Sequence, residues 1–105
     1  MTPFTLKGVI KLVDRRLVVD GDECYGVTEA EGQRFKIRLS GKNIETADDF
    51  LTTLLHEVMH LWIFVAMEAL GFKMSTAASH RIIDVVVPFA MEQFYREYNH
   101  KRKRK

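Results

Sequence analysis

The sequence contains one cysteine, two prolines and no long uninterrupted apolar segment. A single thiol cannot form an internal disulfide, which excludes a secreted scaffold held together by disulfides. We expect Cys24 to be a half-buried cysteine in a strand rather than a reactive thiol. The longest apolar stretch, residues 61–67, is too short to cross a bilayer, and residues 1–13 alternate in polarity, unlike a signal peptide. The sequence therefore predicts a cytoplasmic protein that does not contact a membrane.

Net charge is also small, at +2, but it is unevenly distributed. Five lysines and arginines occupy residues 101–105, so the rest of the chain has a net charge of −3 (2 − 5). This basic tail can be interpreted as a contact for nucleic acid or as a solvated terminus, and we favour the second interpretation. The 105 residues suit one domain, which we assign to residues 1–99, followed by the tail at residues 100–105.

The first half of the chain has the pattern of β-strands. Strands are expected at residues 4–13, 16–20, 24–28 and 34–40, with turns at Asp20-Gly21 and Glu31-Gly32. In the last strand the apolar side chains alternate with basic ones, so one face is expected to contact the core. A strand with so many basic residues on one face is typical of the edge of a sheet, where charge discourages unwanted pairing.

The second half has the pattern of two helices. Thr46 is a plausible N-cap of the first helix and Gly71 its C-terminal cap, and apolar residues on most sides predict a central, buried helix. The second helix is expected from Ser75 or Thr76 to about Asn99, with a kink or break at Pro88. Its expected apolar face consists of Ile82, Ile83, Val86, Phe89, Ala90, Phe94 and Tyr98. The predicted fold class is α+β, with a small antiparallel sheet of three or four strands packed against two helices.

His56 and His60 are four residues apart in the predicted first helix. That spacing places both imidazoles on one face of the helix, where they can bind a single zinc ion. Glu57 lies near the same face. Zinc lowers the pKa of a bound water to about 7, and a nearby carboxylate can then accept the proton as hydroxide attacks a carbonyl. The alternative is that the three residues serve packing alone, which would place polar groups on a buried face at a cost in free energy.

A catalytic zinc site needs a third protein ligand and one position open to water. The metzincin spacing would require a histidine at position 66, which is alanine, and the segment around Cys24 does not match the cysteine ligand of peptide deformylases. His80, near the start of the second helix, is the third ligand that we favour. Asp84 follows it by one turn, and is expected either to orient the His80 imidazole or to bind the metal in its place.

Residues 25–98 resemble the small HExxH proteins of bacteriophages and prophages that are described as metallopeptidases. The resemblance rests on a β-hairpin that ends in residues 34–39, on the segment Thr53-Leu54-Leu55-His56-Glu57-Val58-Met59-His60-Leu61, and on a Leu70-Gly71-Phe72 break before a second helix. This arrangement is similar to the minimal core of the gluzincin peptidases and of the ImmA/IrrE group.

The resemblance implies that His56 and His60 bind zinc and that Glu57 is the general base. It also implies that residues 34–39 form the edge that holds an extended peptide substrate, and that the protein acts in the cytoplasm of a bacterial host. The chain departs from its relatives at the third ligand, because they usually have a glutamate near the start of the second helix where this chain has His80.

Three functions follow as hypotheses. The leading one is a zinc-dependent metallopeptidase, a hydrolase that acts on a protein or peptide substrate with one zinc ion as its cofactor. The second is a non-catalytic zinc-bearing phage protein that binds a host protein. The third is a nucleic-acid-associated protein that acts through residues 101–105. The substrate, the oligomeric state and the metal bound in the cell stay open.

Overall fold

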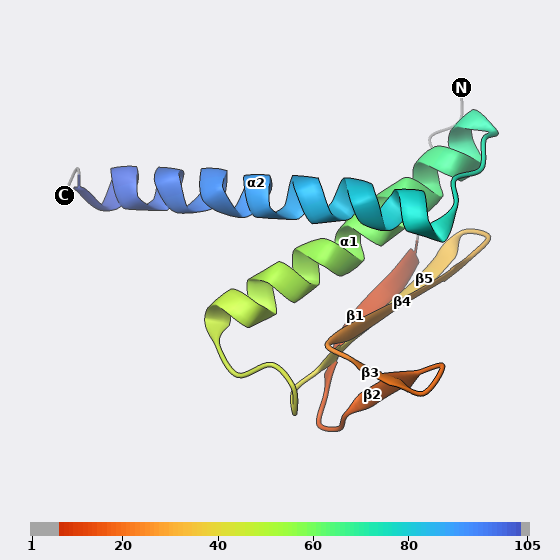
Figure 1. The fold of residues 1–105 in the computed structure, drawn as a ribbon, viewed down its shortest axis with the longest axis horizontal. Helices are drawn as coiled ribbons and strands as arrows, with labels where there is room; N and C mark the ends of the chain where they lie inside the picture. The colour runs from red at the N-terminus through yellow and green to blue at the C-terminus, as the bar shows by residue number, and fades with distance from the viewer. Residues whose placement is uncertain (1–6, 104–105) are drawn as a thin grey trace.

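The computed structural model describes residues 7–103, and it places five strands before two long helices (Figure 1). The strands are β1 (Lys7–Val13), β2 (Leu17–Val19), β3 (Asp22–Cys24), β4 (Gly26–Glu31) and β5 (Arg34–Ser40), and the helices are α1 (Ala47–Leu70) and α2 (Thr76–Lys103). The predicted α+β class is confirmed. Residues 4–6 of the predicted first strand lie outside the described residues.

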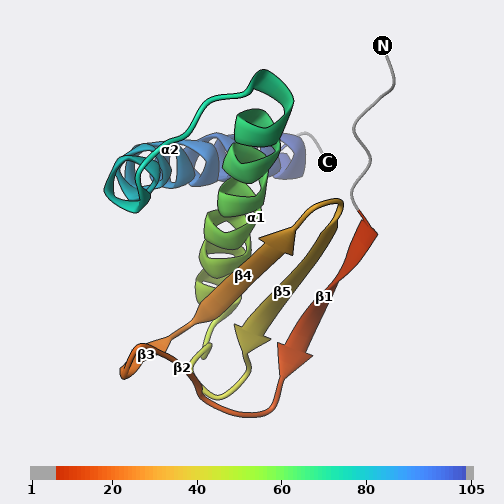
Figure 2. The same ribbon diagram turned by 90° about the vertical axis from the view of Figure 1, so that its right-hand side faces the viewer.

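The main sheet has the strand order β1-β5-β4, and Figure 2 shows its three strands side by side. β4 and β5 form the expected antiparallel hairpin, whose turn contains Gly32 at φ +60°. β1, however, pairs with β5 in parallel, so the sheet is mixed rather than purely antiparallel. β2 and β3 form a separate antiparallel hairpin. The chain reaches β5 from β1 only after this hairpin and β4, which allows β1 and β5 to run in the same direction.

β5 is therefore the central strand, and the prediction that it lies at an edge is wrong. Its basic residues lie on the open face of the sheet, where Arg38 forms an ion pair with Glu29 of β4 at 2.5 Å. Ile37 and Leu39 lie on the opposite face and are fully buried, as predicted. The alternation thus separates a solvent face from a core face, and it carries no information about the order of the strands.

α1 lies between the sheet and α2, as predicted for a central helix. Its Leu61 packs with Ile37 and Leu39 of β5, while its Ile63 packs with a cluster of residues on α2. Both predicted caps are confirmed. The backbone N–H of Asp49 donates to the hydroxyl of Thr46 at 3.0 Å, and Gly71 adopts the left-handed conformation with φ 72°.

α1 is also long and apolar enough to cross a membrane, judged by length and composition alone. The uninterrupted apolar stretch of residues 61–67 is short, but the most apolar 18-residue window of the helix has a mean hydropathy of 1.5. In the structure this apolar surface contacts β4 and β5 on one side and α2 on the other. A helix placed between two layers needs apolar residues on most of its circumference. Only 17% of this window is buried, and Trp62 and Leu70 are exposed, so packing explains only part of the composition.

α2 begins at Thr76, as predicted, and the hydroxyl of Ser75 accepts from the N–H of Ala78 at 3.1 Å. A kink or a break was expected at Pro88, and the break is absent, because α2 continues as one helix to Lys103. Proline removes the hydrogen bond to the carbonyl four residues earlier, which belongs to the exposed Asp84, so water can take its place. The helix also continues past residue 99, and no break separates the predicted domain from the start of the basic tail.

The apolar face predicted for α2 is only partly correct. Ile83 is fully buried and packs on α1, together with Val87 and Met91, which were not predicted to face the core. The predicted core residues Ile82, Val86 and Phe89 lie on the solvent side of the helix. α2 therefore has apolar residues on two faces, and α1 covers only one of them.

Candidate metal centre

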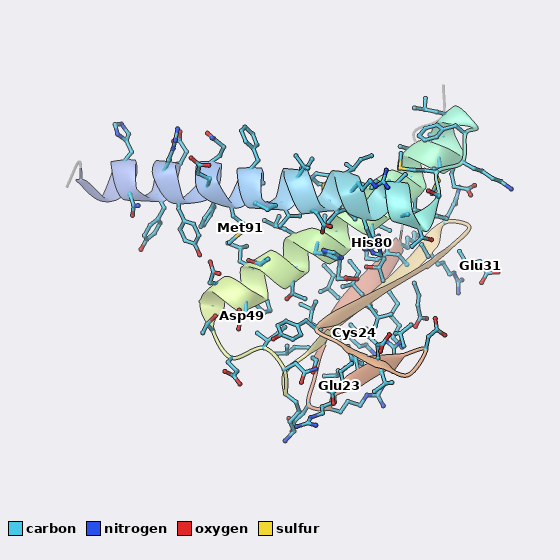
Figure 3. The ribbon with its side chains drawn as sticks, in the orientation of Figure 1. Glu23, Cys24, Glu31, Asp49, His80 and Met91 are labelled. Atoms are coloured by element: carbon cyan, nitrogen blue, oxygen red, sulfur yellow. The ribbon has the colours of Figure 1, made fainter. Side chains whose placement is uncertain are left out.

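Three histidines from two helices converge beside the sheet. His56 and His60 lie one turn apart on α1, and His80 lies in the first turns of α2, on the side that faces α1 (Figure 3). Each ring offers one nitrogen, and these three nitrogens all lie within 4.8 Å of one another. The centroid of the His60 ring lies 4.9 Å from that of His56 and 4.9 Å from that of His80. The two predicted helical ligands and the favoured third ligand thus form one cluster.

The spacing of the first pair fits a shared metal ion. The Nε2 atoms of His56 and His60 are 3.2 Å apart. Two nitrogens bound to one tetrahedral zinc at about 2.0–2.1 Å would be about 3.3 Å apart. Without a metal the same distance suits a hydrogen bond in which one ring donates and the other accepts. The donor set, three imidazoles with space beside them, suits zinc, copper, iron or nickel.

Burial favours the neutral form of His56 and His60, because it lowers the pKa of both imidazoles. It is the main cause that lowers the pKa of His60 to about 4, and the positive charges on His56 and His80 lower it further. The pKa of His56 is lowered by burial and by His80, whereas the negative charge of Asp84 raises it. Metal ions bind the neutral imidazole. The two histidines of α1 therefore bind a metal ion at neutral pH without first losing a proton.

Asp84 does not belong to the cluster. The group of side chains that the structure brings within metal-binding distance contains His80 and excludes Asp84, which is exposed one turn further along α2. The negative charge of Asp84 acts on the cluster by raising the pKa of His56. Among the described residues, the geometry thus favours His80 over Asp84 as the third ligand, and Asp84 is left as a nearby negative charge.

Glu57 is buried next to this cluster, with 5% of its surface exposed. The hydroxyl of Thr28 on β4 lies 3.1 Å from Oε1 of Glu57 and 3.1 Å from its backbone carbonyl oxygen. Burial raises the pKa of Glu57, and the hydrogen bond from Thr28 partly opposes this effect. A carboxylate with a raised pKa is a better proton acceptor at neutral pH. No local sequence pattern points to Thr28, because its partner is 29 residues away.

The cluster opens into a pocket of about 780 Å³. His56, Glu57, His60 and His80 line it together with three groups of residues: Gly26, Val27, Thr28 and Ala30 of β4; Thr52, Thr53, Phe64 and Thr76 of the helices; and Val19, Cys24 and Tyr25 of the β2–β3 region. Among residues 7–103, Glu57 is thus the only carboxylate that lines the pocket, and no lysine or arginine of this range lines it. Cys24 is half-buried at the end of a strand, as predicted.

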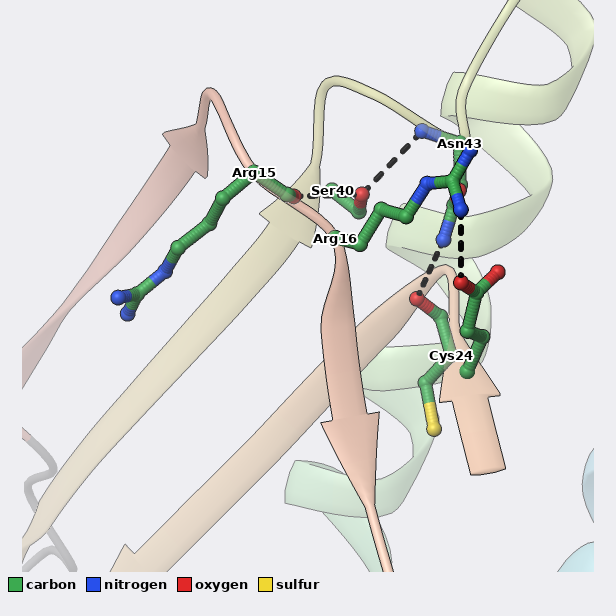
Figure 4. Close-up of polar contacts among 6 residues, drawn as sticks. Arg15, Arg16, Cys24, Ser40 and Asn43 are labelled. Carbon is green, nitrogen blue, oxygen red and sulfur yellow. Dashed lines mark hydrogen bonds and ion pairs between the residues drawn. The ribbon is translucent and has the colours of Figure 1, made fainter. Parts of the chain in front are cut away.

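A small polar network holds the β2–β3 hairpin against this pocket (Figure 4). The side-chain amide of Asn43 donates to the carbonyl of Cys24 at 3.2 Å, and its backbone N–H donates to the hydroxyl of Ser40 at 3.2 Å. The hydroxyl of Ser40, which is fully buried, donates in turn to the carbonyl of Arg15 at 2.8 Å. These bonds join the β1–β2 loop, the end of β3 and the segment that leads from β5 to α1. No sequence pattern singles out Asn43 and Ser40 for this role, because a lone Asn or Ser near a turn has many local roles.

Comparisons with protein families, with curated proteins and with solved structures found no match for this chain. The case for its function consequently rests on the cluster, its neighbours and the pocket.

Proposed function

We propose that this protein is a zinc-dependent metallopeptidase in which His56, His60 and His80 bind the metal and Glu57 is the general base. One observation carries the proposal: three imidazoles from two helices converge at the mouth of a pocket, next to a buried carboxylate. Three protein ligands leave one position for water, as in other catalytic zinc sites. The resemblance to phage-encoded HExxH proteins points to the same chemistry and stays a hypothesis.

The residues of the site have distinct roles under this proposal. A zinc ion held by His56, His60 and His80 would supply a water of lowered pKa and would polarise the carbonyl to be cleaved. Glu57 accepts the proton of that water, and can return it to the leaving amine as the peptide bond breaks. The hydroxyl of Thr28 holds Oε1 of Glu57, and the Glu57 side chain lines the pocket.

The outer edge of β4 offers a place for the substrate. The backbone N–H of Ser40 donates to the carbonyl of Tyr25 at 2.8 Å, so these two residues form a hydrogen-bonded pair. Hydrogen-bonded and non-hydrogen-bonded pairs then alternate along the β4–β5 hairpin. Val27 and Glu29 therefore bond to β5, while the N–H and C=O groups of Thr28 and Ala30 point outward. β4 has no strand partner on that side within residues 7–103. An extended peptide that pairs with this edge would lie along the pocket.

Elemental mass spectrometry of the purified, untagged protein is the first test. The expected result is one zinc per chain in the wild type, loss of zinc in His80→Ala, and retention of zinc in Asp84→Ala. Absence of zinc after dialysis against excess metal would overturn the proposal. One zinc per chain in His80→Ala but none in Asp84→Ala would instead make Asp84 the third ligand.

Cleavage is tested separately, with a library of unstructured peptides analysed by mass spectrometry. We expect cleavage by the zinc-loaded wild type and none by Glu57→Gln, which removes the proton acceptor but keeps the size of the side chain. Bound zinc without cleavage of any peptide would favour the second hypothesis, a zinc-bearing protein that binds a partner. Equal cleavage by both proteins would exclude Glu57 as the general base.

A further inference from the structure

α2 has a second apolar face that no other part of the described chain covers. Ile82, Val85, Val86 and Phe89 follow the spacing i, i+3, i+4, i+7, which places them in one stripe along the helix. We call these four residues the outer stripe. Val85 is 72% exposed and Phe89 is 62% exposed. The stripe lies opposite Ile83, Val87 and Met91, which pack on α1.

Two residues of opposite charge flank the outer stripe on the same side. Arg81 and Glu92 are eleven positions apart, which is close to three turns of helix, so they lie within about 20° of one another around the axis. Arg81 makes no ion pair in the part of the chain that the structure describes. Glu92 pairs with Arg96 through Oε1 at 2.7 Å, and its other oxygen can accept a further partner.

The positions of these residues have an internal symmetry. Arg81 and Glu92 are equally distant from the peptide bond between residues 86 and 87, and Ile82 and Phe89 from the bond between residues 85 and 86. The two centres differ by one residue, or about 1.5 Å along the helix. Consider two identical helices that pair antiparallel about a two-fold axis near residue 86. Arg81 of each copy then faces Glu92 of the other. The same register places Val85 and Val86 at the centre, with Ile82 and Phe89 on either side.

We infer that α2 pairs with α2 of a second copy of this chain, antiparallel and about a two-fold axis near Val86, through the outer stripe. A self-complementary surface of this kind is what a two-fold interface requires. Two ion pairs flank the apolar contact, and they form only when the helices are antiparallel. His80 lies on the side of α2 that faces α1, so the pairing leaves the candidate metal centre open. The inference does not depend on the proposed function.

Sedimentation velocity of the full chain over a range of concentrations tests the inference. We expect the wild type to have twice the mass of the chain at high concentration and to dissociate on dilution. Val85→Asp should be monomeric throughout, because it places a charge at the centre of the stripe. Val85 is exposed, so this variant should keep the circular dichroism spectrum and the zinc content of the wild type. A wild type that is monomeric at every concentration overturns the inference.

Charge reversal tests the register. Arg81→Glu and Glu92→Arg should each weaken the dimer about tenfold, since each puts two pairs of like charges in contact. The double variant Arg81→Glu/Glu92→Arg restores both pairs and should return the dissociation constant to within about threefold of the wild type. Arg34→Glu, an exposed reversal on β5, is the matched control and should have no effect. A dimer that is equally weak in the double variant contradicts the antiparallel register.

Discussion

The hydroxyl of Thr28 on β4 and the carboxylate of Glu57 on α1 form a hydrogen bond of 3.1 Å across the interface between sheet and helix. Glu57 is buried, so an oxygen without a partner would cost free energy. The bond joins the strand that lines the pocket to the proposed general base. It makes Thr28 a positioning residue for Glu57, and this role can be separated from a purely structural one.

Thr28→Val removes the hydroxyl and almost conserves the shape of the side chain. A hydrogen bond to a charged group contributes about 1.5–3 kcal/mol, so we expect kcat for peptide cleavage to fall about tenfold or more. KM and the zinc content should change little, because the ligands and the edge of β4 are untouched. Thr28→Ser, which keeps the hydroxyl, should recover most of kcat. Loss of zinc in Thr28→Val would assign the residue to the ligand geometry instead.

Ala30→Pro removes one outward-pointing N–H from the edge of β4. Proline is tolerated at an edge strand where the N–H faces solvent, so the fold should persist. We expect KM for peptide substrates to rise several-fold, because one backbone hydrogen bond to the substrate is lost. Ala30→Val keeps the N–H and is the matched control. Equal KM values for the two variants would show that the substrate does not pair with β4.

Gly26 allows β4 to approach α1 closely. A Cβ atom at this position would lie 2.9 Å from Cγ of Glu57 and 3.0 Å from Cγ2 of Thr53. Overpacking of this kind costs about 1–3 kcal/mol, so Gly26→Ala should lower the free energy of unfolding in urea by about that amount. Leu39 Cδ2 would lie 3.1 Å away as a third contact. Thr53→Ser removes one of the three contacts, and should recover part of the loss in the double variant. Unchanged stability in Gly26→Ala would mean that β4 can move away without cost.

Acid should destabilise the metal-free protein through its histidines. The pKa of His60 in the folded protein is about 4, below the ordinary value of 6.5. Between these two values the unfolded chain binds a proton that the folded chain does not, so the free energy of unfolding should fall as the pH decreases from about 6.5 to about 4. The lowered pKa of His56 acts in the same direction. Urea unfolding in the presence of a chelator measures this dependence.

Glu57 has the opposite effect in the same experiment. Burial raises the pKa of Glu57 above its ordinary value of 4.5. The folded state therefore loses stability as the pH rises from about 4.5 through the raised pKa. The measurement is therefore made in the Glu57→Gln background, where this titration is absent. Adding His60→Gln should flatten the remaining dependence between about pH 4 and 6.5. An unchanged slope after that substitution would show that His60 is not the group responsible.

The elements that the sequence predicts well depend on local contacts. Thr46 and Gly71 cap α1 because a hydroxyl before a helix and a glycine after it satisfy its terminal N–H and C=O groups, whatever the rest of the fold. His56, Glu57 and His60 share one region of α1 because of the geometry of the helix itself. The core face of β5 follows from alternation in the same way.

The order of the strands was decided by contacts between distant residues. β5 is central because β1 pairs with it in parallel, with Lys7 opposite Arg34, and no local signal in β5 encodes that pairing. The basic residues of β5 suggested an edge strand, but they are basic because they lie on the exposed face of the sheet. As a result, β5 has no free edge, and the edge strand that lines the pocket is β4.

The sequence by itself determined the composition of the site: two histidines and a glutamate on one helix, with His80 and Asp84 as the candidates on the next. Only the tertiary structure could bring one of these two candidates to His56 and His60, because this depends on where α2 crosses α1, and it brings His80 there. It also decided which face of α2 is buried, because packing on α1 selects Ile83, Val87 and Met91 from a helix that is apolar on two sides. Helix geometry is set by neighbouring residues, whereas the crossing of two helices depends on side chains that the whole chain must first bring together.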